Sequence, residues 1–225
     1  EHSHLQDLLT QEKKLAIDKL VAHCQAHGVQ ATGEILHGTS SAKTLEFAVR
    51  EKIDLIIRIA KGQRSLQTGS LGTSAQQLIR RLSCPLWLIR PEHEPVTKKI
   101  IASVDATPDN EAHANLNQQI LSTATELAKA ERCTLIVTYV WNLYGGDMLR
   151  SRLPSSEYDA LITHNRQQHQ ANFEALLTSF GLHATGPEAR MIEGEPSLAI
   201  PELCTREDAD LLICGTVARH GFAGI

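Results

Sequence analysis

The chain has 225 residues, a formal net charge of −4, 42% apolar residues and only 4% aromatic residues. That length fits one large domain or two small ones, and the apolar fraction is sufficient to build hydrophobic cores. The acidic balance provides no basic face of the kind that phosphate-backbone binding requires, which argues against nucleic acid as a partner. No apolar run approaches the roughly 18 residues of a membrane span, so the sequence predicts no membrane partner.

The five cysteines are odd in number, dispersed along the chain and free of any CxxC motif. This usage favours buried thiols in a reducing compartment over a disulfide framework. The first ten residues are acidic and amphipathic, unlike a signal peptide. We therefore expect a cytoplasmic protein.

Apolar residues at helical spacing from Leu5 to Cys24 predict a long first helix, which Gly28 ends. After it, the pattern predicts a strand at Thr32–Leu36, a helix at Ser41–Lys52 and a strand at Leu55–Ile59. A loop at 60–72, a helix at Ser74–Leu82 and a strand within 84–91 follow. Residues 91–97 contain two prolines and are predicted to be a linker.

The second half opens with an apolar strand, "KKIIASVDAT" at 98–107, which ends at Asp105. A helical stripe from Leu116 to Leu127 and a strand at 133–141 come next. The wide segment 142–157 is predicted to be a loop. A long helix marked by Tyr158 to Phe180, a strand at Ala189–Ile192, a helix near Leu198–Glu207 and a strand at Leu211–Cys214 complete the chain. Apolar runs that alternate with helices indicate parallel sheets covered on both faces.

The two halves repeat one pattern at a constant offset of 156 positions, which takes Gly38 to Gly194 and Asp54 to Asp210. The offset holds over about 26 positions with matched apolar and acidic character, which indicates two copies of one unit. The first copy lacks the opening strand–helix–strand of the second, roughly 60 residues, and the second lacks the closing helix and strand, roughly 35 residues. We therefore expect both domains to be incomplete in this chain.

Three stretches, "KIIASVDAT", "GEPSLAIPELCTREDADLLICGTVARHG" and "GTSAQQLIRRLSCPLWLIR", together resemble the universal stress protein family over essentially the whole chain. The paired arrangement is similar to that of tandem-domain members. The resemblance implies an α/β fold of two tandem universal-stress-protein (adenine nucleotide alpha hydrolase-like) domains, at residues 1–90 and 98–225. Each would be an open parallel sheet with helices on both faces. It also implies that the two domains pair with each other as a pseudo-dimer, and it leaves a homodimer open.

Nucleotide-binding members of that family carry a G-x2-G-x9-G-[ST] loop, in which glycines let backbone N–H groups approach phosphate oxygens. In the first copy Gly62, Gly72 and Thr73 match the later part of this motif, but Ile59 occupies the first glycine position. A β-branched side chain fills the space that the phosphates need, so we expect this loop to be degenerate for ATP.

In the second copy the loop begins with Gly215 and Thr216, has Ala218 at the second glycine position, and continues past Ile225. The resemblance implies ATP or AMP as the cofactor of this second domain. Arg219 and the neighbouring His220 are candidate anion ligands, and the alternative is that they are solvated loop residues.

Asp105 and Gly215 each follow a strand on the edge where open parallel sheets bind ligands. The resemblance implies that Asp105 contacts the adenosine part of a nucleotide and that Val104 and Val140 line the adenine slot. The alternative for Asp105 is a turn or a helix N-cap within Asp-Ala-Thr-Pro-Asp.

Other polar patterns give weaker evidence of a functional site. His23 and His27 form HxxxH on a helix without a third ligand, so we interpret them as surface histidines. His164 and His169 are five residues apart, which is a worse spacing for a metal site. The recurring glutamates Glu46, Glu51, Glu202 and Glu207 are expected to face water. No motif of a catalytic constellation is present.

Three functional hypotheses follow. The first is a stress-response binding module that acts through a ligand or partner. The second is a nucleotide hydrolase or nucleotidyl-transfer enzyme on the same sheet, which fold alone does not separate from the first. The third is a binder of an apolar ligand or a protein partner, with the segment 142–157 as a lid.

Overall fold

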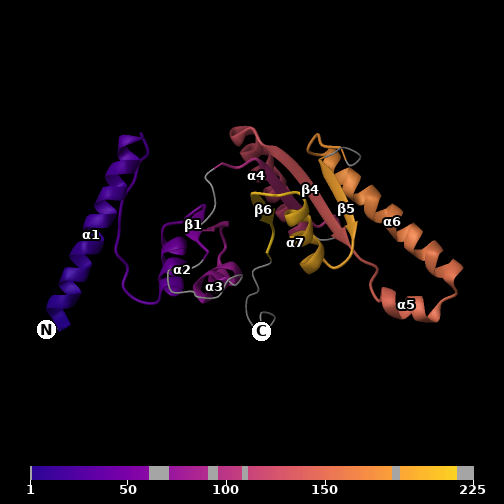
Figure 1. Ribbon diagram of the computed structural model, residues 1–225, viewed down its shortest axis with the longest axis horizontal. Helices are drawn as coiled ribbons and strands as arrows, with labels where there is room; N and C mark the ends of the chain where they lie inside the picture. The colour runs from indigo at the N-terminus through magenta and orange to yellow at the C-terminus, as the bar shows by residue number, and fades with distance from the viewer. Residues whose placement is uncertain (1, 61–70, 91–95, 108–110, 184–187, 217–225) are drawn as a thin grey trace. The chain divides into compact units, whose positions relative to one another are not determined.

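The structure is a computed structural model that describes residues 2–60, 71–90, 96–107, 111–183 and 188–216. Two compact units divide the chain: a first unit up to Pro91 and a second unit from Glu92 to Val217. Each contains a parallel sheet with helices packed on it, so both belong to the α/β class that the alternating pattern predicts (Figure 1).

The first unit contains α1 (His2–Ala26), α2 (Ser40–Arg50), β1 (Ile56–Ile59), α3 (Thr73–Arg81) and β2 (Leu86–Ile89). Strands β1 and β2 pair in parallel. Ala48 of α2, Leu78 of α3 and Leu82 form the small core between these helices and the two strands.

The strand expected at Thr32–Leu36 is wrong, because this segment has no strand assignment. Its counterpart in the second unit is a strand only because a neighbouring strand pairs with it along its length. The described part of the first unit contains no strand in that position, so the backbone groups of 32–36 have no ladder to join. The segment instead lies against α1, where Gly33 packs directly on Ile17.

The second unit contains β3 (Lys99–Val104), α4 (Glu111–Glu131), β4 (Thr134–Trp141), α5 (Gly146–Arg152), α6 (Ser155–Thr178), β5 (Ala189–Glu193), α7 (Pro196–Arg206) and β6 (Leu211–Cys214). All four strands are parallel and lie in the order β5-β4-β3-β6.

The loop expected at 142–157 is also wrong, because α5 and the first turn of α6 occupy most of it. Gly145, with φ 69°, makes the turn that precedes α5. The residues after it include good helix formers such as Met148, Leu149 and Arg150, so a short helix forms here. The expectation of a loop gave too much weight to the turn-forming residues of this segment.

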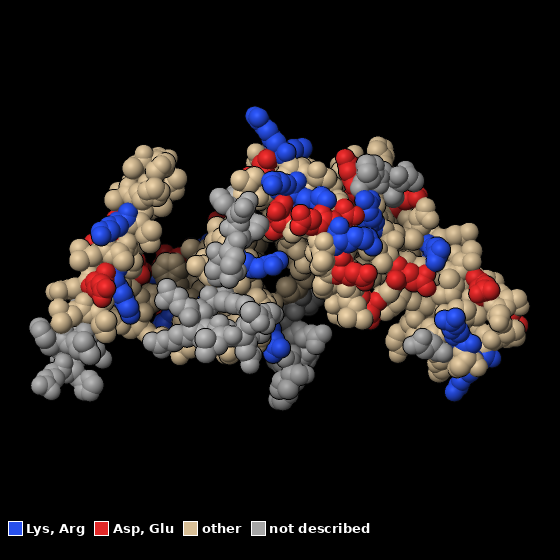
Figure 2. All heavy atoms as spheres, viewed as in Figure 1, with Lys and Arg blue, Asp and Glu red and all other residues tan. Residues whose placement is uncertain are grey.

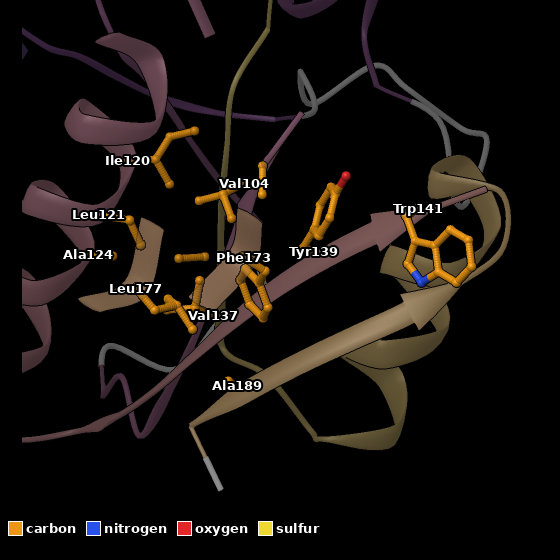
Figure 3. Packing of buried hydrophobic residues seen from close by; sticks show 12 residues of the cluster. Val104, Ile120, Leu121, Ala124, Val137, Tyr139, Trp141, Phe173, Leu177 and Ala189 are labelled. Atoms are coloured by element: carbon orange, nitrogen blue, oxygen red, sulfur yellow. The ribbon is translucent and has the colours of Figure 1, made fainter. Parts of the chain in front are cut away.

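Helices cover both faces of the second sheet. Leu121 and Ala124 of α4 and Phe173 and Leu177 of α6 pack on one face, as Figure 3 shows. Leu203 of α7 packs on the other face, against inward-facing side chains of β3 and β4. Successive residues of a strand point to opposite faces, which is why two separate clusters form on one sheet.

The repeat extends to individual backbone angles. Helices α2 and α7 begin and end at positions that differ by 156. At the same offset, Gly38 and Gly194 both have positive φ angles, 132° and 155°, and Lys52 and Asp208 have φ angles of 51° and 52°. Two unrelated segments have no reason to share left-handed residues at matched positions, so the two copies share one local fold.

Both helices end in the same hydrogen-bonded cap. The N–H of Ile53 donates to the carbonyl of Ala48 (3.0 Å), and the N–H of Ala209 donates to the carbonyl of Cys204 (2.9 Å). This six-to-one bond around a left-handed residue is the Schellman motif, a position that glycine normally occupies. Lys52 and Asp208 adopt it with a Cβ, which carries a steric cost.

A polar network joins α7 to the amino end of β3. Asp210 Oδ2 accepts hydrogen bonds from the backbone N–H groups of Lys98 (2.7 Å) and Lys99 (2.8 Å). Glu207 lies 3.5 Å from both the Lys99 ammonium and the Arg190 guanidinium, and its side chain is only 19% exposed. The expectation that Glu207 faces water is therefore wrong, because two cations on β3 and β5 hold it against the sheet.

The described cysteines are all free thiols, and they are less buried than the sequence suggested: four are half-buried and Cys214 is exposed. Burial raises the pKa of the Cys84 and Cys133 thiols, which keeps them protonated at neutral pH. Among the helices that the structure describes, none combines the length and the apolar character needed to cross a bilayer.

We predict that Asp208→Gly stabilises the second unit by about 0.5–1 kcal/mol, because glycine adopts the left-handed conformation without steric cost. The measurement is the free energy of unfolding from urea denaturation. Arg206→Gly, two residues earlier at the end of α7, is the control and should destabilise by about 0.5–1 kcal/mol. A loss of stability in both variants would contradict the left-handed cap at Asp208.

Candidate functional site

The strand order reverses beside β3. The chain proceeds from β3 to β4 to β5, then returns across the opposite face through α7 to β6, on the other side of β3. Crevices at such reversals, outside the carboxyl ends of the strands, are the usual ligand sites of open α/β sheets. Ser103 lies opposite Cys214 in the β3–β6 ladder, so Asp105 and Gly215 leave neighbouring strands at the same edge, as the sequence predicts.

The backbone of Asp105 is held by the side chain of Asn117 from α4. The Asp105 N–H donates to Asn117 Oδ1 (3.0 Å), and Asn117 Nδ2 donates to the Asp105 carbonyl (2.6 Å). Asn117 is 6% exposed, so this amide finds its partners inside the protein. Sequence reasoning missed Asn117, although its spacing of four and seven residues from Leu121 and Ala124 places it on the buried stripe of α4.

The carboxylate of Asp105 closes a local turn. Its Oδ1 accepts hydrogen bonds from the backbone N–H of Thr107 (3.0 Å) and from the Thr107 hydroxyl (2.6 Å). This is an Asx turn, in which an Asp side chain bonds to the backbone two residues further on. The turn that the sequence left open as an alternative is therefore present, and the turn fixes where the carboxylate stands at the sheet edge.

Gly215 is required by the packing of α4. A Cβ at this position would lie 2.3 Å from Leu116 Cδ2 and 2.8 Å from Leu116 Cγ, with Ile120 Cδ1 at 3.3 Å. In the first unit Ile59 occupies the equivalent position and is 56% exposed. No helix like α4 covers that face among the described residues of the first unit, so an isoleucine fits there.

The other expected ligand residues lie apart from one another. Val104 is buried with Tyr139 and Trp141 on the face covered by α4 and α6, whereas Val140 follows Tyr139 and therefore lies on the α7 face. The two valines do not share one slot. Thr216 is exposed beside Gly215. Arg219, together with Ala218 and His220, lies outside the described residues.

In the first unit, Gly72 is the N-cap of α3 and Thr73 is its first residue, so this pair opens a helix as the motif requires. Gly72 has φ −62°, an ordinary angle that does not require glycine. Gly62 lies outside the described residues.

An aromatic cluster with one histidine stands beside Asp105. The hydroxyl of Tyr139, on β4, lies 2.6 Å from Nδ1 of His169, on α6. The imidazole stacks on Trp141 with ring centroids 4.8 Å apart, and Tyr139 also contacts Phe173. Figure 3 shows the Tyr139 hydroxyl pointing away from Phe173 and Val137. The sequence singled out His169 only as half of a poorly spaced metal pair, although its spacing of four and eight residues from Phe173 and Leu177 puts it on the inner stripe of α6.

The environment of this cluster favours neutral side chains. Burial lowers the pKa of His169, and the Asp105 carboxylate acts in the opposite direction. Burial also raises the pKa of Tyr139. His169 is thus neutral at pH 7. Its contribution to stability is present above its ordinary pKa of 6.5 and declines as the pH falls below it.

The remaining histidine pair is a surface feature. His23 and His27 are both exposed, with ring centroids 4.5 Å apart, and His27 Nδ1 lies 2.8 Å from the His23 carbonyl oxygen. Within the described ranges, no group of three or more metal-ligating side chains is present. On the face of the second unit seen in Figure 2, acidic and basic side chains are interspersed.

Comparison with known proteins identifies one family. A family model described as "Universal stress protein family" matches residues 1–90 and 98–225. The Universal stress protein E homolog of Haemophilus influenzae is 26% identical over 172 residues, which cover 76% of this chain and 54% of that protein. Universal stress protein E of Escherichia coli is 23% identical over 172 residues, covering 76% and 53%. The chain thus spans about half the length of the curated relatives it matches.

Solved structures share the fold. A protein of unknown function from Pseudomonas aeruginosa PAO1 aligns with a TM-score of 0.76 at 20% identity, covering 94% of this chain and 69% of that one. A universal stress protein from Archaeoglobus fulgidus aligns with a TM-score of 0.60 at 13% identity, covering 95% and 70%. At these identities the likeness establishes the fold alone.

We predict that Gly215→Ala destabilises the second unit by about 1–3 kcal/mol, because the added Cβ overlaps the side chain of Leu116. Gly72→Ala is the matched control and should be nearly neutral, since its nearest neighbour would be the Ala60 carbonyl oxygen at 3.7 Å. Unfolding in urea measures both changes.

A double-mutant cycle tests the cause of this loss. In a Leu116→Ala background, the cost of Gly215→Ala should become smaller because the overlapping atoms are gone. An unchanged cost in that background would rule out the overlap with Leu116 as its origin.

Proposed function

Because the chain belongs to the universal stress protein family, we propose that it is a stress-response protein that acts by binding a small ligand, an adenine nucleotide, at the strand reversal of its second unit. The single observation that carries this proposal is the pairing of β3 with β6, which brings the Asp105 turn beside the exposed residues Gly215 and Thr216. Among the residues that the structure describes, no arrangement of nucleophile and base accompanies Asp105 and Gly215, so we favour binding over turnover.

The residues present fit the adenosine part of a nucleotide. Asp105 is a carboxylate at the carboxyl edge, held in place by Asn117 and by its own turn. A carboxylate is a hydrogen-bond acceptor, and the hydroxyl groups of ribose and the amino group of adenine are donors of the matching kind. Of the phosphate loop, the described residues contain only Gly215 and Thr216, whose backbone N–H groups suit an anion.

We predict that Asp105→Asn weakens binding of AMP and of magnesium-bound ATP several-fold, by about 0.5–1.5 kcal/mol. Asparagine keeps an oxygen that can accept from Thr107 and also favours the Asx turn, so the turn should survive while the charge is lost. Isothermal titration calorimetry on the whole chain measures the dissociation constants.

Asp159→Asn, at an exposed position of α6, is the control and should leave both constants unchanged. If Asp105→Asn lowers thermal stability but leaves binding intact, Asp105 serves the turn alone and the ligand lies elsewhere.

We further predict that the first unit does not bind ATP, because Ile59 replaces the first glycine of its loop. With magnesium and ATP added to about 1 mM, amide resonances around Ile59 and Gly72 should not shift in a saturable way. A threshold of 1 mM corresponds to about −4 kcal/mol of binding free energy. Micromolar saturation at these residues would overturn this expectation.

A further inference from the structure

Two aromatic side chains of β4 share one histidine. Tyr139 and Trp141 are two residues apart on the strand, so they point to the same face of the sheet. On that face the Tyr139 hydroxyl lies 2.6 Å from Nδ1 of His169, and the Trp141 indole stacks on the same imidazole with ring centroids 4.8 Å apart. One imidazole is therefore in contact with both rings.

These rings are concentrated in one place. The whole chain has two tryptophans, three tyrosines and four phenylalanines, and one of each kind lies in this cluster. Tyr139 and Trp141 are 2% and 3% exposed, so the protein shields both of these oxidisable rings from water. A buried hydroxyl requires a hydrogen-bond acceptor. That requirement alone does not call for an acceptor that is a base, or for an indole stacked on it.

The contact between Tyr139 and His169 has the geometry of a proton transfer. A separation of 2.6 Å between the hydroxyl oxygen and Nδ1 is within the reach of a general base. Neutral His169 with its proton on Nε2 accepts the hydroxyl hydrogen at Nδ1. Burial raises the pKa of Tyr139 and lowers the pKa of His169. At neutral pH the pair is thus a protonated phenol beside an unprotonated base.

A base in this position changes how the phenol loses an electron. A phenol that loses an electron but keeps its proton becomes a radical cation, which is a very strong acid and therefore costly to form. When a base is in hydrogen-bond contact, the electron and the proton leave together and the radical cation is bypassed. Histidine is the side chain best suited to accept that proton near neutral pH. An oxidised indole is a strong enough oxidant to take the electron.

We propose that Tyr139 and His169 form a redox-active pair, which takes up the oxidising equivalent when a one-electron oxidant, such as an oxygen-centred radical, removes an electron from Trp141. One electron passes from Tyr139 to the Trp141 radical cation. The Tyr139 O–H bond breaks, and its proton forms an N–H bond at Nδ1 of His169. The products are neutral Trp141, a neutral tyrosyl radical and an imidazolium, so the positive charge moves from the indole to the imidazole. This inference goes beyond the proposed function, because it requires no ligand at the sheet edge.

Flash photolysis tests the transfer from Tyr139. In the Trp87→Phe variant Trp141 is the single tryptophan. A pulse of light that indole absorbs and phenol does not ejects an electron from Trp141, and dissolved oxygen captures that electron. The absorption band of the tryptophan radical should then decay at the rate at which the tyrosyl band rises.

Two further substitutions in the Trp87→Phe background identify the electron donor. Tyr139→Phe keeps the buried ring but removes the hydroxyl, so the tyrosyl band should be lost and the tryptophan radical should live longer. Tyr144→Phe is the control, because Tyr144 is only three residues from Trp141 but is 97% exposed. It should change neither band. A tyrosyl band that persists without the Tyr139 hydroxyl would overturn the proposal.

The role of His169 is tested by keeping the hydrogen bond and removing the base. In the same background, His169→Gln supplies an amide oxygen that accepts the hydroxyl hydrogen but does not take up its proton. The transfer should slow at least about tenfold, a cautious figure beside the roughly 10²–10⁴-fold contribution of a positioned base. His164→Gln, at an exposed position of α6, is the matched control and should leave the rate unchanged. An unchanged rate in His169→Gln would mean that the bond is structural only.

A third measurement needs no substitution at the pair. In D2O the transferred particle is a deuteron, so the transfer in the Trp87→Phe variant should be slower than in H2O. This test decides the question if His169→Gln does not fold, which the loss of its near-ultraviolet circular dichroism would reveal. Equal rates in the two solvents would show that the electron moves without the proton, and the role of His169 would be overturned.

Discussion

Strand β3 is the constraint on which the second unit depends, because it is paired on both sides and buried on both faces. Its ladder with β4 runs from Lys99 to Val104, and β6 pairs along its other edge. Ile100, Ile101 and Ala102 are fully inaccessible to solvent. A strand so enclosed has one register, since a shift by one residue would exchange its two apolar faces. Asp105 follows the carboxyl end of β3, so the register of the strand also fixes the position of Asp105.

Helix α4 couples this core to the candidate site through two adjacent residues. Asn117 binds the backbone of Asp105, and Leu116 occupies the space above Gly215. The two sides of the strand reversal are therefore set by one turn of one helix. A group at the sheet edge that is positioned by core packing is pre-organised, which reduces the ordering cost of binding. The same arrangement means that core and site cannot vary independently.

The sequence predicted the features that depend on pattern over many residues: the parallel sheets, the repeat, and the shared edge of Asp105 and Gly215. It failed where the outcome depends on a partner elsewhere. Residues 32–36 match a strand locally, but the described part of the first unit offers them no neighbouring strand to pair with. The family resemblance assigned Val104 and Val140 to one slot, whereas the register of β3 against β4 sets Val104 opposite Tyr139 and so puts the two valines on opposite faces of the sheet.

The polar residues of the site were harder to predict for a related reason. Asn117 and His169 each occupy an apolar helical stripe, and only the residues that face them from the sheet show why a polar side chain is tolerated there.

The bond between Asp210 and the first amides of β3 has a consequence for biosynthesis. Asp210 and Lys98 are 112 positions apart in the chain. A contact over such a separation requires a large loop to close, and the conformational entropy of that loop is lost before the contact stabilises the fold. At a translation rate of about 5–20 residues per second, β3 is synthesised roughly 5–20 seconds before Asp210 and β6 follow. Throughout that interval one edge of a strongly apolar strand has no partner in its own chain, and such edges pair readily with other chains. The half-made sheet, rather than the finished one, is the species that a cell has to protect from aggregation.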